Sequence, residues 1–272
     1  MQFVRKHLSR AILAIPLIFL SVVAIYPFIY MVLLSFTSAR SMVLRFSDLT
    51  LDFRNYISIY VNFDFFRYMI NSTIVAGGGV FANILIASMA AYGFVKKVMP
   101  GRKLLFNIVL ISMMVPGQVT IVTVFLMMLN IGILDTYLSL FLPHVGAFGV
   151  FLVSQFMHGV PDELLEAAKI DGCGEARTYF SIVLPLIRTV LVSLAIFIFI
   201  ATWNDLIWPL ITISDRSMRT LVLALSILSG NYATNYGLVM AGATLTFLPP
   251  FLLYVFLQKR FVEGIALSGI KG

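Results

Sequence analysis

The segment TWNDLIWP gathers side chains that suit a sugar. Trp203, Asn204 and Asp205 offer an aromatic face, an amide and a carboxylate in consecutive positions. Sugar rings place their C–H faces on aromatic side chains, while their hydroxyls exchange hydrogen bonds with amides and carboxylates. The competing interpretation is an aromatic belt at the membrane interface, and we favour the belt for Trp208, which stands beside Pro209. We interpret Trp203, Asn204 and Asp205 as candidates that line a polar pathway.

His144 and Asp205 are the two ionisable residues within the strongly apolar segments. A charge inside a bilayer is costly, so such a residue is a candidate for function by default. A proton relay needs a longer series of these groups. Each residue also has a simpler interpretation, as a side chain that is hydrogen-bonded within the protein. We predict that both lie in the outer part of the membrane, where they could meet or share a water-filled cavity.

Apolar helices must position these residues. Of the 272 residues, 60% are hydrophobic and 11% are charged, against about 25% charged in soluble domains. Mean hydropathy is +1.00. About 20 apolar residues cross a bilayer as a helix, and no run has the alternation of a membrane β-strand. The sequence therefore predicts an all-α polytopic membrane protein with a single transmembrane domain over residues 1–272. Its six spans are expected at about 11–36, 68–95, 104–129, 137–157, 189–212 and 236–258.

The positions of the basic residues predict the orientation. The net charge is +7, but Lys and Arg fall between apolar runs, which indicates membrane lipid rather than nucleic acid as the partner. Thirteen of the 19 lie on the N-terminal side of the six spans. By the positive-inside rule both termini are cytoplasmic. We interpret the basic cluster around Lys96 and Lys97 as a topology anchor, and the run Gly77-Gly78-Gly79 as a site of close helix packing or a hinge.

Residues 160–185 form a polar cassette in the longest cytoplasmic loop, between the fourth and fifth spans. Pro161, acidic residues in the following turn, and Gly172 predict a helix of about three turns. A second helix is expected from about Glu175 to Pro185. Two short helices at a glycine elbow would form a knob that transmits force. The alternative is a loop that lies on lipid headgroups.

The cassette resembles the EAA loop of ABC-importer permeases, which reads Glu-Ala-Ala, three residues, Gly, nine residues, Ile-x-Leu-Pro. The segments VPGQVTIV, LDTYLSLFLP, ATWNDLIWPL and FVEGIALSGIKG are similar to the carbohydrate-uptake branch, particularly the smaller permease of maltose-type transporters. Thr123 departs from that pattern, because the family often has proline there. The residues that match the EAA loop, and that the resemblance implies for ATPase coupling, are Glu166, Ala167, Ala168, Gly172, Ile182, Leu184 and Pro185.

The resemblance implies a permease that forms half of a translocation pathway in the bacterial cytoplasmic (inner) membrane. A soluble extracytoplasmic substrate-binding protein would deliver a disaccharide, an oligosaccharide, or a sugar or glycerol phosphate. The implied partners are a second homologous permease and two cytoplasmic ATPase subunits, which would bind ATP and Mg. This chain has no Gly-x-x-x-x-Gly-Lys phosphate loop. We therefore expect no catalytic residue, cofactor or metal in it.

Two other functions compete with this interpretation. An ion-coupled secondary transporter would need more intramembrane charge, and transport that persists with an inactive ATPase would favour it. An intramembrane enzyme would need a nucleophile with its base, or paired carboxylates on facing spans. We find no such set in the sequence. Activity of the purified single chain would favour the enzyme.

Overall fold

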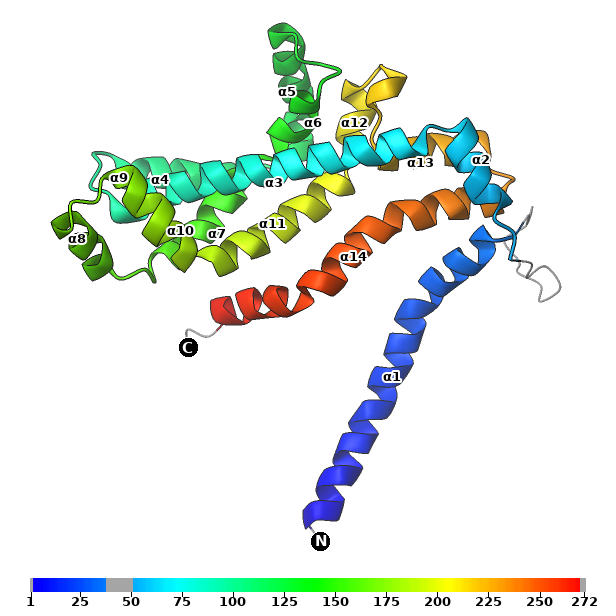
Figure 1. Ribbon diagram of the computed structural model, residues 1–272, viewed down its shortest axis with the longest axis horizontal. Coiled ribbons are helices and arrows are strands. Elements are labelled where there is room, and N and C mark those ends of the chain that lie inside the picture. Colours follow the sequence, from blue (N-terminus) through cyan, green and yellow to red (C-terminus); the bar gives the residue numbers. More distant parts are fainter. Residues whose placement is uncertain (1, 38–50, 270–272) are drawn as a thin grey trace. The chain divides into compact units, whose positions relative to one another are not determined.

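The structure is a computed structural model that describes residues 2–37 and 51–269, with side chains for residues 14–37 and 51–258. Every helix or strand assignment within those ranges is a helix (Figure 1), so the expected all-α fold is confirmed. The basic side chains of the first ten residues and the side chains of the tail FVEGIALSGIKG lie outside the described ones.

Three helices are long and apolar enough to cross a bilayer alone. They are α1 (Gln2–Ser35), α3 (Phe65–Lys96) and α14 (Tyr236–Gly269). Three bent pairs bring the number to six if each pair is one span. In the first pair, α4 (Arg102–Ser112) and α5 (Gly117–Ile131) are bent by 104° relative to each other. In the second pair, the segment of α6 (Tyr137–Phe141) and η2 (Leu142–His144) is bent by 49° relative to α7 (Ala147–Met157). In the third pair, the helices of Glu175–Leu186 are bent by 77° relative to α11 (Arg188–Trp203). The predicted runs overlap these helices, but the sequence did not predict their bends.

The breaks occur where the local sequence interrupts the helical hydrogen bonds. Pro116 precedes α5 in an extended conformation, and Gly146 does the same before α7. Proline removes a backbone donor, and the extended conformation of Gly146 takes its backbone out of the helical hydrogen-bond pattern. The run expected at 189–212 is also interrupted, because α11 ends at Trp203 and α12 (Ile207–Thr212) begins three residues after Asn204.

The chain forms two compact units. The first contains residues 1–65 and 225–248, and the second contains residues 66–224 and 249–272. In the first unit, α2 (Arg54–Asn62) is fixed by Asn55, whose amide donates to the carbonyl oxygens of Ser35 and Thr37 at 2.9 and 2.8 Å. The remaining helices are η4 (Arg216–Met218) and α13 (Leu221–Asn231), together with α8 to α10, which are described below.

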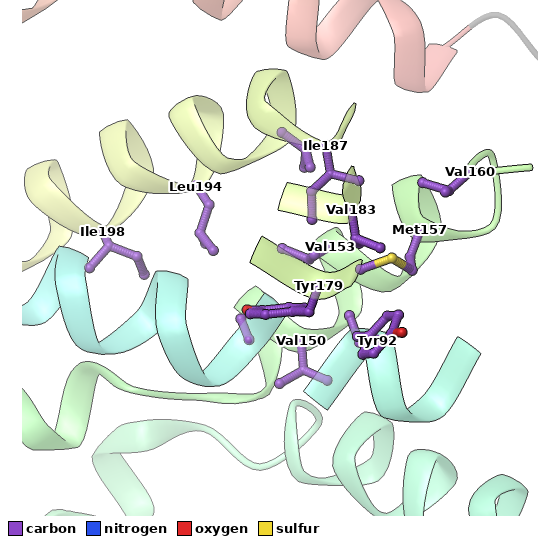
Figure 2. Close-up of a cluster of buried hydrophobic side chains, with 13 residues drawn as sticks. Tyr92, Val150, Val153, Met157, Val160, Tyr179, Val183, Ile187, Leu194 and Ile198 are labelled. Atoms are coloured by element: carbon purple, nitrogen blue, oxygen red, sulfur yellow. The ribbon is translucent and has the colours of Figure 1, made fainter. Parts of the chain in front are cut away.

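The core of the second unit packs α3 against α7, α11 and the segment before α11 (Figure 2). Val153, Met157, Val183 and Leu194 have no exposed surface. Inside a bilayer such packing is stabilised by close van der Waals contact rather than by removal of water. The segment before α11 belongs to the polar cassette, so the cassette is built into the same core as the spans.

The glycine run in α3 permits close helix packing, as predicted, at two of its three positions. A Cβ at Gly78 would lie 2.9 Å from the ring of Phe141, and one at Gly79 would lie 3.2 Å from the hydroxyl oxygen of Thr202. A Cβ at Gly77 would meet no atom within 4 Å. Gly78 and Gly79 therefore allow α6 and α11 to approach α3.

Candidate coupling loop and pathway pocket

The first helix of the cassette is α8 (Asp162–Ile170). Pro161 lies just before its first residue, in an extended conformation. Acidic residues occupy the first turn and Lys169 the last, an order that favours the helix dipole at both ends. The predicted helix is present with these bounds. We call residues 160–185 the coupling loop.

Gly172 ends α8 in a Schellman motif. Its φ is +75°, the left-handed region that glycine accepts without a Cβ penalty. The N–H of Gly172 donates to the carbonyl of Lys169 at 3.1 Å, and the N–H of Cys173 donates to the carbonyl of Ala168 at 2.9 Å. These are the two hydrogen bonds that define the motif. The elbow is therefore a fixed turn and not a loose connection.

The second part of the coupling loop is a helix with a π-helical insertion. It runs through α9 (Glu175–Thr178), η3 (Tyr179–Val183) and α10 (Leu184–Leu186). The N–H of Leu184 donates to the carbonyl of Tyr179, five residues back, and Pro185 has no N–H to continue the regular pattern. The hydroxyl of Tyr179 lies 2.6 Å from the hydroxyl of Ser88 in α3. The widened turn is thus fixed against a span.

Two lysines at the end of α3 hold both helices of the coupling loop. The ammonium of Lys96 donates to the carbonyl of Val160 at 2.5 Å and lies 2.7 Å from Oδ1 of Asp162. The ammonium of Lys97 lies 2.7 Å from Oε1 of Glu175. We call Lys96, Lys97, Asp162 and Glu175 the lysine clasp. The topology-anchor interpretation missed this role, although acids at the start of both predicted helices were a possible signal.

The Lys97–Glu175 pair of the lysine clasp is largely solvated, whereas the side chain of Lys96 is 5% exposed and that of its partner Asp162 is 74% exposed. Hydrogen bonds from Lys97 and then from the hydroxyl of Tyr92 lower the pKa of Glu175. Burial acts to lower the pKa of Lys97, but its hydrogen bonds to Glu175 and Tyr92 outweigh burial and the pKa is raised. The Lys97 and Glu175 side chains are 38% and 73% exposed. Such a pair contributes about 0.2–1 kcal/mol, enough to bias the loop's position but not to hold the fold.

The coupling loop presents an outward face that has no partner in this chain's core. Ile170 is 86% exposed and Leu164 is 41% exposed, beside charged residues of α8. Ala168 instead is buried, so it positions the helix and is not available to a partner. Of the other predicted coupling residues, Glu166, Ala167, Gly172 and Pro185 are exposed, while Ile182 and Leu184 are half-buried.

His144 and Asp205 lie together, in a pocket of about 250 Å³. Nε2 of His144 is 3.2 Å from Oδ2 of Asp205, and each side chain is about one fifth exposed. The backbone N–H of Trp208 donates to the other carboxylate oxygen at 3.2 Å. The amide of Asn83 donates to the backbone carbonyl of His144 at 2.9 Å. The pair is therefore fixed from both sides.

The other residues of the TWNDLIWP segment take different positions. Trp203 is 2% exposed and stacks on Phe199, with ring centroids 5.4 Å apart. Asn204 is exposed and its amide donates to the carbonyl of Ile200, so neither residue lines the pocket. Trp208 does line it, and its indole N–H donates to the carbonyl of Ser139 at 2.7 Å. Because Trp208 is buried, the interpretation as a lipid-interface belt is wrong.

The segment after α12 is held by polar contacts with two earlier parts of the chain. Oδ1 of Asp135 accepts from the backbone N–H groups of Ser214 and Asp215 at 2.6 and 2.9 Å. The amide of Asn71 donates to the carbonyls of Ser217 and Arg219 at 2.8 and 2.9 Å. This loop therefore has a defined conformation that a partner could recognise.

Comparison with known proteins places this geometry in a family. Residues 83–266 match the family described as binding-protein-dependent transport system inner membrane component. The arabinooligosaccharides transport system permease protein AraQ of Halalkalibacterium halodurans is 31% identical over 96% of both chains. The lactose transport system permease protein LacG of Rhizobium radiobacter is 32% identical over 89% of both. The sn-glycerol-3-phosphate transport system permease protein UgpE of Pectobacterium atrosepticum is 36% identical over 72% of this chain and 71% of its own length.

Two solved structures share the fold. A bacterial ABC transporter involved in the import of the acidic polysaccharide alginate aligns with a TM-score of 0.81 at 20% identity, over 94% of this chain and 97% of its own. The bacterial alginate ABC transporter in complex with an alginate pentasaccharide-bound periplasmic protein aligns with a TM-score of 0.64 at 16% identity, over 95% and 96%.

Proposed function

The chain belongs to the family of binding-protein-dependent transport system inner membrane components, and we propose that it is a permease subunit of an ATP-driven carbohydrate importer. It forms half of the translocation pathway, and a second homologous permease forms the other half. The names of its relatives, which include arabinooligosaccharide and lactose transport, support carbohydrate as the cargo class. A soluble extracytoplasmic protein delivers the cargo, and both termini of this chain are cytoplasmic.

The chain itself is a transport component, and two cytoplasmic ATPase subunits bind and hydrolyse ATP with Mg. The coupling loop carries this proposal, because it combines an outward apolar face with a rigid attachment to the spans. Ile170 is 86% exposed on that face. A single exposed apolar residue is ordinary on a protein surface, so the proposal rests on Ile170 together with the exposed Leu164 and the EAA pattern of the same helix. The partner that it fits is a groove on an ATPase subunit.

The attachment of the coupling loop to the core explains how motion of the ATPase subunits would reach the membrane helices. ATP-driven closure of the ATPase dimer moves α8, and the Schellman elbow passes this motion to α9 and η3. Tyr179 and Val183 are buried in the same core as α3, α7 and α11 (Figure 2). Packed cores move as rigid bodies rather than deform continuously. The helices that line the pathway therefore rotate together, from inward-open to outward-open.

Reconstitution of the complete transporter in proteoliposomes tests the proposed function. The assembly contains this chain, its partner permease, the ATPase subunits and the soluble binding protein, and uptake of radiolabelled lactose and arabinotriose is measured. We expect uptake of at least one sugar that requires ATP and stops with a hydrolysis-deficient ATPase subunit. Uptake driven by an ion gradient with that inactive subunit would replace the proposal with a secondary transporter, and uptake of neither sugar would overturn the cargo class.

A further inference from the structure

Three helix breaks in the second unit meet at one pocket. Gly117 and Gln118 come from the break between α4 and α5, and His144 from the break between η2 and α7. Asp205 and Ile207 come from the break between α11 and α12. We call this 250 Å³ cavity the break pocket.

Breaks of this kind are costly in a bilayer unless they have a purpose. Each interrupted turn leaves backbone N–H and C=O groups without helical partners, and hydrocarbon cannot satisfy them. Irregular backbone is tolerated at membrane depth where it lines a water-filled cavity or is buried in protein. Transporters use discontinuous helices in this way to build cargo sites. The convergence of three such breaks at one cavity makes the break pocket the candidate cargo site.

The side chains of the break pocket match a sugar ring. The carboxylate of Asp205 and the imidazole of His144 offer hydrogen bonds to hydroxyls, and both are fixed in position. The amide of Gln118 makes no hydrogen bond with the residues that the structure describes, so it is available to a ligand. Ile121 and Trp208 add apolar walls. An apolar cavity with a few fixed polar groups is typical of small-molecule sites.

The charge of the break pocket selects among carbohydrates. Asp205 is an acid, and none of the described residues that line the cavity is Lys or Arg. An anionic ligand would meet a carboxylate without a permanently charged cation to offset it. The volume of about 250 Å³ is below the roughly 300 Å³ at which pockets for drug-sized ligands begin, which favours one ring rather than a chain.

We propose that the break pocket binds one ring of a neutral carbohydrate, so that this subunit contacts its cargo directly. This inference rests on the proposed function and specifies its substrate class. It distinguishes the chain from relatives named for an anion, such as the sn-glycerol-3-phosphate permease UgpE, and from the fold neighbour that imports acidic alginate. Neutral sugars bind, while sugar phosphates and sugar acids are rejected.

Cysteine protection in the complete transporter tests this inference. Cys173, the chain's one cysteine, is replaced by serine, and Gln118→Cys or Val122→Cys is added. Val122 lies on the same helix and is 65% exposed but does not line the pocket. A charged methanethiosulfonate reagent is applied in the presence of lactose or arabinotriose, or of sn-glycerol 3-phosphate. We expect the reagent to label the Gln118→Cys chain about tenfold faster than the Val122→Cys chain, because a charged group enters a water-filled cavity more readily than hydrocarbon. A neutral sugar should protect the Gln118→Cys chain.

Three results would overturn the inference: equal labelling of the two variants, no protection by either neutral sugar, or protection by sn-glycerol 3-phosphate. ATP-driven uptake is measured in the same vesicles. If uptake proceeds without protection, the break pocket is refuted while the proposed function stands. If uptake is absent, the proposed function fails instead.

Asp205→Asn provides a second readout with a conservative change. Loss of a hydrogen bond to a charged group weakens binding about tenfold or more, so KM for the neutral sugar should rise by that factor. A structural role alone would lower assembly and leave KM unchanged. If the variant fails to assemble, the protection result for Gln118→Cys decides.

Discussion

Gly172→Val tests whether the elbow of the coupling loop must be rigid. Gly172 has φ +75°, and a Cβ there would meet no atom within 4 Å, so the penalty comes from the backbone and not from a clash. An L-residue in the left-handed region costs about 1–2 kcal/mol, which corresponds to about a 5- to 30-fold shift between the native elbow and a relaxed one. The Schellman hydrogen bonds that end α8 are lost in the relaxed state.

Gly174→Val is the matched control, because Gly174 has φ −69° and equally open surroundings. The assay measures ATPase stimulation by the sugar-loaded binding protein in the complete transporter, with membrane insertion checked separately. We expect stimulation to fall about 5- to 30-fold for Gly172→Val, by the same penalty, and to stay near the parent value for Gly174→Val. Both variants should insert normally. Equal stimulation in the two variants would refute the role of the elbow.

Further predictions concern the lysine clasp and the glycine run. Lys97→Met should reduce stimulated ATP hydrolysis by up to about fivefold, and the exchange Lys97→Glu with Glu175→Lys should restore part of it; no recovery would argue against a direct pair. Because the pKa of Glu175 is lowered from 4.5, the pair stabilises the loop above that pH and is lost as pH falls through the lowered value. Glu175→Gln should remove this acid dependence from the melting temperature. Gly78→Val should cost about 1–3 kcal/mol through overpacking against Phe141, which lowers the melting temperature, whereas Gly77→Val has open space; equal melting temperatures would contradict the close packing.

The features that sequence could predict are those that depend on residues close together in the chain. Apolar runs predicted the long helices, and the acidic turn followed by Gly172 predicted α8 and its end. The depth of His144 and Asp205 along their spans predicted their proximity, and the structure places them 3.2 Å apart. Each of these inferences uses only one or two segments, because the rise per residue of a helix fixes how far along the helix a side chain lies.

The features that sequence could not predict depend on distant contacts. Lys97 and Glu175 are 78 positions apart, so their pairing requires the folded core. The helix breaks were hidden because hydropathy over a long window averages across the few residues that form each break. Gln118 is a single amide in an apolar run, which sequence alone does not distinguish from an amide that packs between helices, and its candidate role in binding cargo follows only from the break beside it.

Site-specific photo-crosslinking tests the central claim, that the coupling loop docks on an ATPase subunit. A benzophenone amino acid is placed at Ile170, which is 86% exposed, or at the control position Leu138, which is 52% exposed. Leu138 is predicted to lie on the other side of the membrane. The complete transporter is irradiated and the product is identified by mass spectrometry. We predict a crosslink to the ATPase subunit from position 170 and none from position 138. A crosslink to that subunit from position 138, or none from position 170, would contradict the account.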